Sequence, residues 1–153
     1  MIKEVKGNIL EAPEDVICHQ VNCMGVMGGG LALQIKNKYP EVYPAYKAYC
    51  KGCKDSNPKN LLGEVQTVPV YDGKIIANLF GQFDYGRDKL YTDYEALKES
   101  LEGILNIATL YSSDSIALPY KLGCGLAGGD WNIVYNIIEE VFDNYDVTIY
   151  NFE

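Results

Sequence analysis

Two glycine-rich segments are the part of this sequence best suited to holding a ligand. The first, 22–30, contains four glycines and follows the short apolar run 16–21; the second, 123–129, follows the run 115–118. Glycine allows a left-handed backbone and lets the main chain approach a ligand closely. A helix that begins after such a turn presents free N–H groups and a partial positive charge. Each segment therefore predicts an anion-binding loop, and the two together could hold a diphosphate between them.

The familiar nucleotide-binding motifs do not occur at these loops. Neither loop is followed by the Gly-Lys-Ser/Thr of an NTPase phosphate loop, and the first strand–helix–strand unit lacks the G-x-G-x-x-G of a nicotinamide-binding domain. We therefore expect no hydrolysis of nucleoside triphosphates.

His19 is the only histidine, and it lies at the end of the apolar run that leads into the first loop. An unperturbed imidazole titrates near pH 6.5, which suits general acid–base catalysis. The alternative is a core imidazole that bonds a backbone group. Asn22 could bond a ligand hydroxyl or simply form the turn. Asp93 is a candidate acid, whereas Asp130 is better explained as a helix cap.

Composition restricts the class of partner. The chain carries 13 Lys+Arg against 21 Asp+Glu, a formal net charge of −8. Such a surface repels a phosphate backbone, so we expect no duplex nucleic acid as partner. No segment approaches the roughly 20 consecutive apolar residues of a membrane span, and residues 1–6 lack the apolar run of a signal peptide. We therefore expect a cytoplasmic monomer that does not contact membranes.

The five cysteines have no disulfide-framework spacing. Cys50 and Cys53 stand in C-x-x-C spacing, but structural zinc needs four ligands and no second pair at matching spacing exists. We expect reduced thiols, no metal and no cofactor, and the sequence assigns no role to this pair.

The loops must be positioned by alternating strands and helices. Apolar alternation and short apolar runs predict six strands, at 2–6, 16–21, 64–71, 74–80, 115–118 and 147–152. Helical spacing predicts four helices, at 31–39, 42–51, 93–108 and 131–142.

Local signals connect these elements. Asp72-Gly73 is a strong hairpin signal between the third and fourth strands, and Thr92 with Glu95 forms a capping-box pattern before the third helix. Strands interleaved with helices, plus one hairpin, predict a single α/β domain over 1–153. We expect three α/β/α layers around a mixed sheet of about six strands.

The motifs at these elements resemble the macrodomain family. Residues 5–10 (VKGNIL), 18–25 (CHQVNCMG) and 28–32 (GGGLA) resemble the opening of a macrodomain, and 118–131 resembles its second phosphate loop. The resemblance covers essentially the whole chain. It is greatest to the branch that contains terminal ADP-ribose glycohydrolases, antitoxin macrodomains and the yeast-type ADP-ribose 1″-phosphate phosphatase.

The resemblance implies a ligand and an activity. ADP-ribose or ADP-ribose 1″-phosphate would be the ligand, and removal of the terminal phosphate would be the leading reaction. The alternatives are an ADP-ribosyl hydrolase that acts on protein or nucleic acid, and a reader that binds ADP-ribose without catalysis.

The resemblance also implies a site. Asn8 and Ile9 would meet the adenine, although many macrodomains carry Asp at the position of Asn8, and Phe152 would pack nearby. The first loop would surround the distal ribose and one phosphate, and the second would give its amides to the diphosphate. The implied ligand-binding residues are Asn8, Ile9, Val21, Asn22, Met27, Gly28, Gly29, Gly30, Leu31, Lys121, Leu122, Gly123, Cys124, Gly125, Leu126, Ala127 and Phe152. The catalytic candidates are His19, which the phosphatase branch shares, Asn22 and Asp93.

Two positions depart from the protein-deconjugating relatives. Those proteins use a lysine shortly after the fourth strand and an aspartate in the second loop, where this chain has Gln82 and Ala127. The resemblance therefore favours the phosphatase or the reader over the glycohydrolase. Phe80, Phe83 and Tyr85 flank an irregular segment that could close over the distal ribose.

Overall fold

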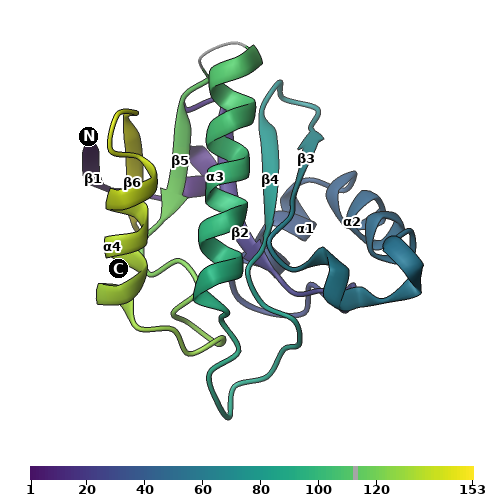
Figure 1. Ribbon diagram of the computed structural model, residues 1–153. Coiled ribbons are helices and arrows are strands. Elements are labelled where there is room, and N and C mark those ends of the chain that lie inside the picture. The colour runs from purple at the N-terminus through teal and green to yellow at the C-terminus, as the bar shows by residue number, and fades with distance from the viewer. Residues whose placement is uncertain (112–113) are drawn as a thin grey trace.

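One mixed sheet forms the centre of the protein in the computed structural model, which describes residues 1–111 and 114–153 (Figure 1). Its strands are β1 (Ile2–Lys6), β2 (Val16–Val21), β3 (Val65–Pro69), β4 (Ile75–Phe80), β5 (Ile116–Pro119) and β6 (Val147–Asn151). They lie in the order β1-β6-β5-β2-β4-β3. Every neighbouring pair is parallel except the β3–β4 hairpin.

Two helices cover each face of the sheet (Figure 1). On one side are α1 (Gly30–Lys38) and α2 (Val42–Lys51), and on the other are α3 (Tyr94–Tyr111) and α4 (Trp131–Val141). The central strand β2 contributes to both cores. Its Ile17 packs under α1 and α2, while Val16 and Cys18 pack under α3 and α4. A strand that is buried on both faces reads as a continuous apolar run, which is how 16–21 is recognisable in the sequence.

The sheet brings three loops to one edge. Because β2, β4 and β5 are parallel neighbours, their carboxyl ends point the same way. The loops that follow them, 22–29, 81–93 and 120–130, therefore gather at that end of the molecule, the lower end in Figure 1. Ligands of open α/β sheets characteristically bind outside the carboxyl ends of the strands.

The predicted three-layer α/β/α fold with a mixed six-stranded sheet is confirmed. The hairpin also forms as predicted: Gly73 takes a left-handed φ of +87° in the turn between β3 and β4. Asp130 caps α4 by accepting a hydrogen bond from the N–H of Asn132 at 2.9 Å.

The predicted capping box before α3 is wrong. The Asp93 carboxylate, not the Thr92 hydroxyl, accepts from a first-turn amide, the N–H of Ala96, at 3.1 Å. The Thr92 hydroxyl instead donates to the carbonyl of Gly123 at 2.6 Å. Threonine and aspartate can both cap a helix. Because the Thr92 hydroxyl is bonded to the second glycine-rich loop, Asp93 is the residue that caps α3.

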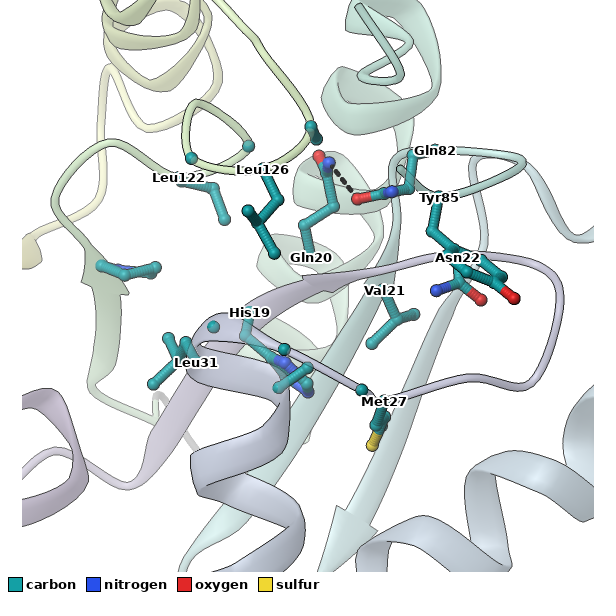
Figure 2. Close-up of a pocket in the computed structure, with 18 of the residues that line it drawn as sticks. His19, Gln20, Val21, Asn22, Met27, Leu31, Gln82, Tyr85, Leu122 and Leu126 are labelled. Carbon is teal, nitrogen blue, oxygen red and sulfur yellow. Dashed lines mark hydrogen bonds between the residues drawn. The ribbon is translucent and has the colours of Figure 1, made fainter. Parts of the chain in front are cut away.

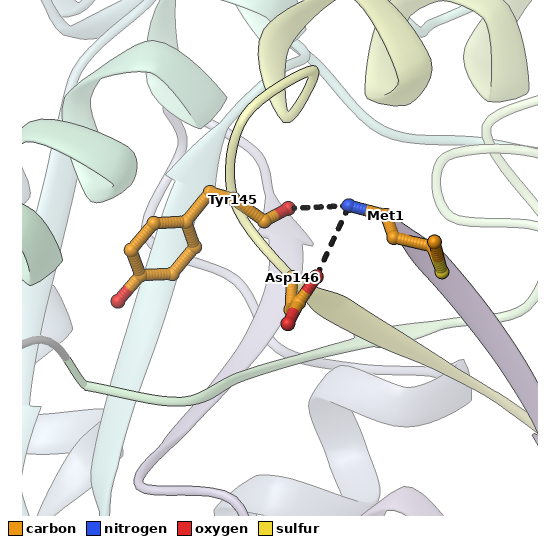
Figure 3. A network of polar contacts seen from close by, with 3 residues as sticks. All are labelled: Met1, Tyr145 and Asp146. Carbon is orange, nitrogen blue, oxygen red and sulfur yellow. Dashed lines mark hydrogen bonds and ion pairs between the residues drawn. The ribbon is translucent and has the colours of Figure 1, made fainter.

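The edge of the sheet at β1 is joined to the turn before β6. The amino group of Met1 lies 3.2 Å from Asp146 Oδ1 and donates to the carbonyl of Tyr145 at 3.2 Å (Figure 3). Because Met1 and Asp146 are almost fully exposed, this ion pair contributes little to stability. No helix in the described part of the chain is long and apolar enough to cross a membrane.

Asp93 supports a stability prediction. Asp93→Ala should lower the free energy of unfolding by about 1 kcal/mol, because α3 loses its N-cap. Asp93→Asn should retain most of that stability, since an amide oxygen also accepts from the first turn. Urea denaturation of the three proteins measures both effects, and an Asn variant as unstable as the Ala variant would contradict a capping role.

Candidate ligand-binding cleft

A cavity of about 530 Å³ lies where the three loops meet (Figure 2). Both glycine-rich loops, the end of β2 and the loop after β4 line it. In Figure 2, Leu122 and Leu126 of the second loop lie across the cavity from Met27 and Leu31. Its volume is within the usual range for a small-molecule site.

The first loop ends at the start of α1, which presents unpaired amides to the cavity. Gly29 is the N-cap residue, with an extended backbone, and no side chain caps the helix. The first-turn N–H groups of Gly30, Leu31 and Ala32 therefore have no intrahelical partner, and these residues line the cavity.

Asn22 shapes the first loop. Its amide oxygen accepts from the N–H of Met24 at 2.9 Å and from the Tyr46 hydroxyl at 2.8 Å. Its amide nitrogen donates to the carbonyl of Val26 at 2.8 Å. Of the two roles open to Asn22, the turn-forming role accounts for both polar atoms.

The second loop supplies further amides. The N–H groups of Gly125, Leu126 and Ala127 bond to none of the described residues. Gly123 has a left-handed φ of +71°, and a Cβ there would lie 2.9 Å from Gln20 Oε1. A larger residue there would be strained and would displace the Gln20 side chain. A Cβ on Gly125 would meet no atom within 4 Å, so a side chain there would enter open space.

The charge of the cleft is opposite to that of the protein. Arg87, the only arginine, and Lys121 line the cavity, and none of the described lining residues is acidic. The net charge of the chain is −8. Unpaired amides and Arg87 favour a small anion here, and Lys121 adds positive charge although its Nζ also lies 3.9 Å from Glu153 Oε1.

His19 lies almost fully buried at the end of β2 beside the cavity. Its Nε2 lies 2.5 Å from the side-chain oxygen of Asn78 on β4. Burial lowers the pKa of His19 to about 4, and the hydrogen bond to Asn78 opposes that shift only in part. The imidazole is therefore neutral near pH 7, and its unprotonated ring nitrogen can accept a hydrogen bond there.

Most of the residues predicted for the ligand site line the cavity. They are His19, Val21, Asn22, Met27, Gly28, Gly29, Gly30, Leu31, Lys121, Leu122, Gly123, Gly125, Leu126 and Ala127.

Five predicted residues do not line the cavity. Asn8 accepts from the N–H of Leu10 as the N-cap of a short 3₁₀ helix, and Ile9 is buried in the core. The Cys124 thiol donates to the carbonyl of Leu122. Phe152 is 74% exposed, and Asp93 caps α3.

Several lining residues were not predicted as ligand-binding residues. They are Gln20, Val26, Ala32, Gln82, Tyr85, Gly86, Arg87, Pro119 and Tyr120. Tyr85, considered above as a covering residue, does line the cavity. The sequence did contain one signal for the loop after β4. Arg87, two residues after Tyr85, is a lone arginine in an acidic chain.

The structure gathers no metal-ligating cluster around Cys50 and Cys53. Among residues 1–111 and 114–153, no group of three or more His, Cys, Asp or Glu side chains could hold a metal ion. Both thiols pack against the core under α1 and α2.

Comparison with known proteins identifies the class. Residues 18–138 match the Macro domain family, and the chain belongs to this family. It is 31% identical to the ADP-ribose 1″-phosphate phosphatase of Scheffersomyces stipitis, and the match covers 96% of each protein. It is 33% identical to the DNA ADP-ribosyl glycohydrolase of Thermus aquaticus over 94% of this chain, which spans only 38% of that longer protein. The solved macrodomain of Thermus aquaticus DarG superposes with a TM-score of 0.80 at 30% identity, covering 99% of this chain and 98% of that one.

The low pKa of His19 predicts a pH-dependent stability. The unfolded chain takes up a proton near pH 6.5, whereas the folded protein takes it up only near pH 4. The free energy of unfolding should therefore decrease as the pH falls through this window, by up to about 3 kcal/mol from this residue.

Urea denaturation at about pH 7 and about pH 4.5 measures the effect, with His19→Gln as the reference. The reference removes the contribution of the carboxylates, which titrate in both proteins. The wild type should lose more stability than His19→Gln, and equal losses would contradict a buried, neutral imidazole.

Proposed function

We propose that this macrodomain binds ADP-ribose in the cleft and hydrolyses the terminal phosphate of ADP-ribose 1″-phosphate. The observation that carries the proposal is the meeting of two loops of unpaired amides with one buried, neutral imidazole in a single cavity. The match to the Scheffersomyces stipitis phosphatase, which covers almost the whole of both proteins, supports the same substrate.

The diphosphate would lie between the two loops. The amides of 125–127 face it from one side, and the first turn of α1 faces it from the other. Helix starts and glycine loops hold phosphate through such N–H groups without needing lysine. Arg87 and Lys121 add positive charge at the cavity.

The adenine end of the site stays a prediction. Asn8 and Ile9 precede β2, and Phe152 follows β6; we propose that they border the adenine outside the cavity itself. Cys124 holds the second loop through its bond to Leu122 and would contribute its backbone to the diphosphate site.

The chemistry proposed for His19 is general-base catalysis. A water oxygen attacks the phosphorus, the bond from phosphorus to the oxygen on C1″ breaks, and the products are ADP-ribose and inorganic phosphate. Neutral His19 takes the proton from the water and returns it to the departing sugar oxygen. Backbone amides and Arg87 stabilise the charge on the phosphate during the attack.

Removal of ADP-ribose from DNA or protein is the second candidate. The identity of 33% to a DNA ADP-ribosyl glycohydrolase favours it. Against it, Gln82 stands where the protein-deconjugating relatives use a lysine, and its side chain is an amide bonded to Gln20 and to the Asp84 carbonyl. Ala127, at the position of their aspartate, offers no carboxylate.

The cellular setting is part of the proposal. Five cysteines without a disulfide framework are consistent with a reducing compartment, so we place the protein in the cytoplasm. The acidic surface supports a monomer, because like charges oppose self-association.

Binding is tested by calorimetric titration with ADP-ribose. The wild type should bind, and Gly125→Glu should bind at least about a hundredfold more weakly, because a carboxylate enters the diphosphate site and like charges repel. Asn106→Glu, which adds the same charge to the exposed face of α3, should bind as the wild type does. Failure of a folded wild type to bind ADP-ribose would reject the proposed function.

Turnover is tested by phosphate release from ADP-ribose 1″-phosphate. His19→Ala should lower the rate by about 10²- to 10⁴-fold, the usual contribution of a general base, and should still bind ADP-ribose. ADP-ribosylated DNA, assayed in parallel, should release no ADP-ribose. Phosphate release that is unchanged in His19→Ala would remove the residue from the mechanism, and release of ADP-ribose from DNA would favour the second candidate.

A further inference from the structure

Two buried acceptor atoms at the end of β2 have no partner within the protein. Among the described residues, His19 Nδ1 and Gln20 Oε1 are the only buried side-chain nitrogen or oxygen atoms that lack a hydrogen bond. They belong to consecutive residues, and both residues line the cavity (Figure 2). Buried polar groups in native proteins are almost always bonded, so two exceptions at one cavity need an explanation.

A row of side-chain amides across the sheet determines which ring nitrogen of His19 carries the proton. Gln66 on β3 donates through Nε2 to the carbonyl of Ala45, a group that can only accept. Gln66 Oε1 therefore faces Asn78 and accepts from its Nδ2 at 3.0 Å. Asn78 Oδ1 is left to face His19, so Nε2 must carry the imidazole proton. In the neutral ring, Nδ1 is then a lone pair.

Hydrogen bonds on the other face of the sheet determine in the same way which end of the Gln20 amide donates and which accepts. Gln82 donates through Nε2 to the carbonyl of Asp84, so its Oε1 accepts from Gln20 Nε2 at 2.8 Å, the dashed line in Figure 2. The Thr92 hydroxyl donates to the carbonyl of Gly123, so its oxygen accepts from the same Gln20 nitrogen at 3.0 Å. Both protons of that nitrogen are used, and Oε1 is left as an acceptor.

Gln20 Oε1 lies on the other face of the sheet, close to Gly81 and Gly123, and does not form one surface with His19 Nδ1. From the first network we infer that His19 Nδ1 is an acceptor that selects a hydroxyl donor and rejects phosphate oxygens. The groups that reach it are the hydroxyls of the distal sugar and the water that attacks the substrate. A phosphate oxygen has no proton to offer there, so the terminal phosphate lies towards Arg87 and the loop amides. Gln66 and Asn78 are positioning residues, since they act through His19. This inference deepens the proposed function and rests on it for the ligand, whereas the tautomer is a property of the free protein.

The tautomer is measurable without ambiguity, because the chain contains a single histidine. Long-range ¹H–¹⁵N correlation spectra of the free protein near pH 7 should show Nε2 protonated and Nδ1 unprotonated. Gln66→Leu removes the acceptor that orients Asn78, and should give a mixture of tautomers. Gln66→Glu keeps an acceptor for Asn78 Nδ2, and should retain the single Nε2–H form. Thermal melts establish that both variants are folded.

The selectivity is measured on the same resonance. Saturation with ADP-ribose should shift the Nδ1 signal towards lower frequency, as hydrogen-bond acceptance does, whereas ADP, which lacks the distal sugar, should leave it in place. An Nδ1–H tautomer in the free protein would overturn the inference whether or not any ligand binds. An unmoved Nδ1 signal at saturation with ADP-ribose would overturn it as well, while the binding function would stand.

Discussion

The parallel pairing of β2 with β4 and β5 is the constraint on which the site depends. β2 lies between these two strands and is buried on both faces, so its position is fixed by hydrogen bonds and by two cores at once. A slip of one residue would send the apolar side chains of β2 to the wrong cores and would exchange the faces of His19 and Gln20. Because all three strands run the same way, their following loops meet at one edge. Two loops of unpaired amides thus converge on one cavity although about a hundred residues separate them in the sequence.

The row from Gln66 to His19 crosses the sheet, and its members Asn78 and His19 are buried. Burying such polar groups is costly unless they are bonded. Asn78 is fully buried, and both ends of its amide are bonded, one to His19 and one to Gln66. The row leaves only its last atom, His19 Nδ1, without a protein partner. The protein thus tolerates one unsatisfied atom beside the cavity, where a ligand can satisfy it. Burial of the ring has a second consequence, because it depresses the pKa of His19 and keeps the imidazole neutral.

Local patterns were sufficient to predict most of the fold. The two-sided burial of β2 and β4, the Asp72-Gly73 turn and the cap at Asp130 each leave a signal within a few residues. The cap of α3 left no such signal, because Thr92 and Asp93 have similar capping ability. The Thr92 hydroxyl instead bonds the carbonyl of Gly123, 31 residues away in the sequence. The role of Asn22 was equally open until Tyr46, on α2, was placed against its side chain.

The site shows the same division between local and long-range information. The glycine-rich loops are visible in the sequence because glycine is required where backbone approaches backbone or ligand. Gln20, Gln82 and Arg87 were not predicted as ligand-binding residues, because their place at the cavity follows from the pairing of β2 with β4 and not from any motif.

The balance of charges explains why a small anion and not a polyanion suits this cleft. At physiological ionic strength, charges are screened beyond about 8 Å, so a short ligand inside the cavity is governed by the amides, Arg87 and Lys121 that line it. A long polyanion would extend past this distance over a surface with 21 acidic residues and only 13 basic ones. Phosphate contacts along such a polymer would find few cations, and its affinity depends on displacing counterions with them. A diphosphate that ends in a sugar is short enough to stay within reach of these amides and of Arg87 and Lys121. A hydroxyl of that sugar also matches the acceptor His19 Nδ1, so charge and hydrogen-bond polarity select the same kind of molecule.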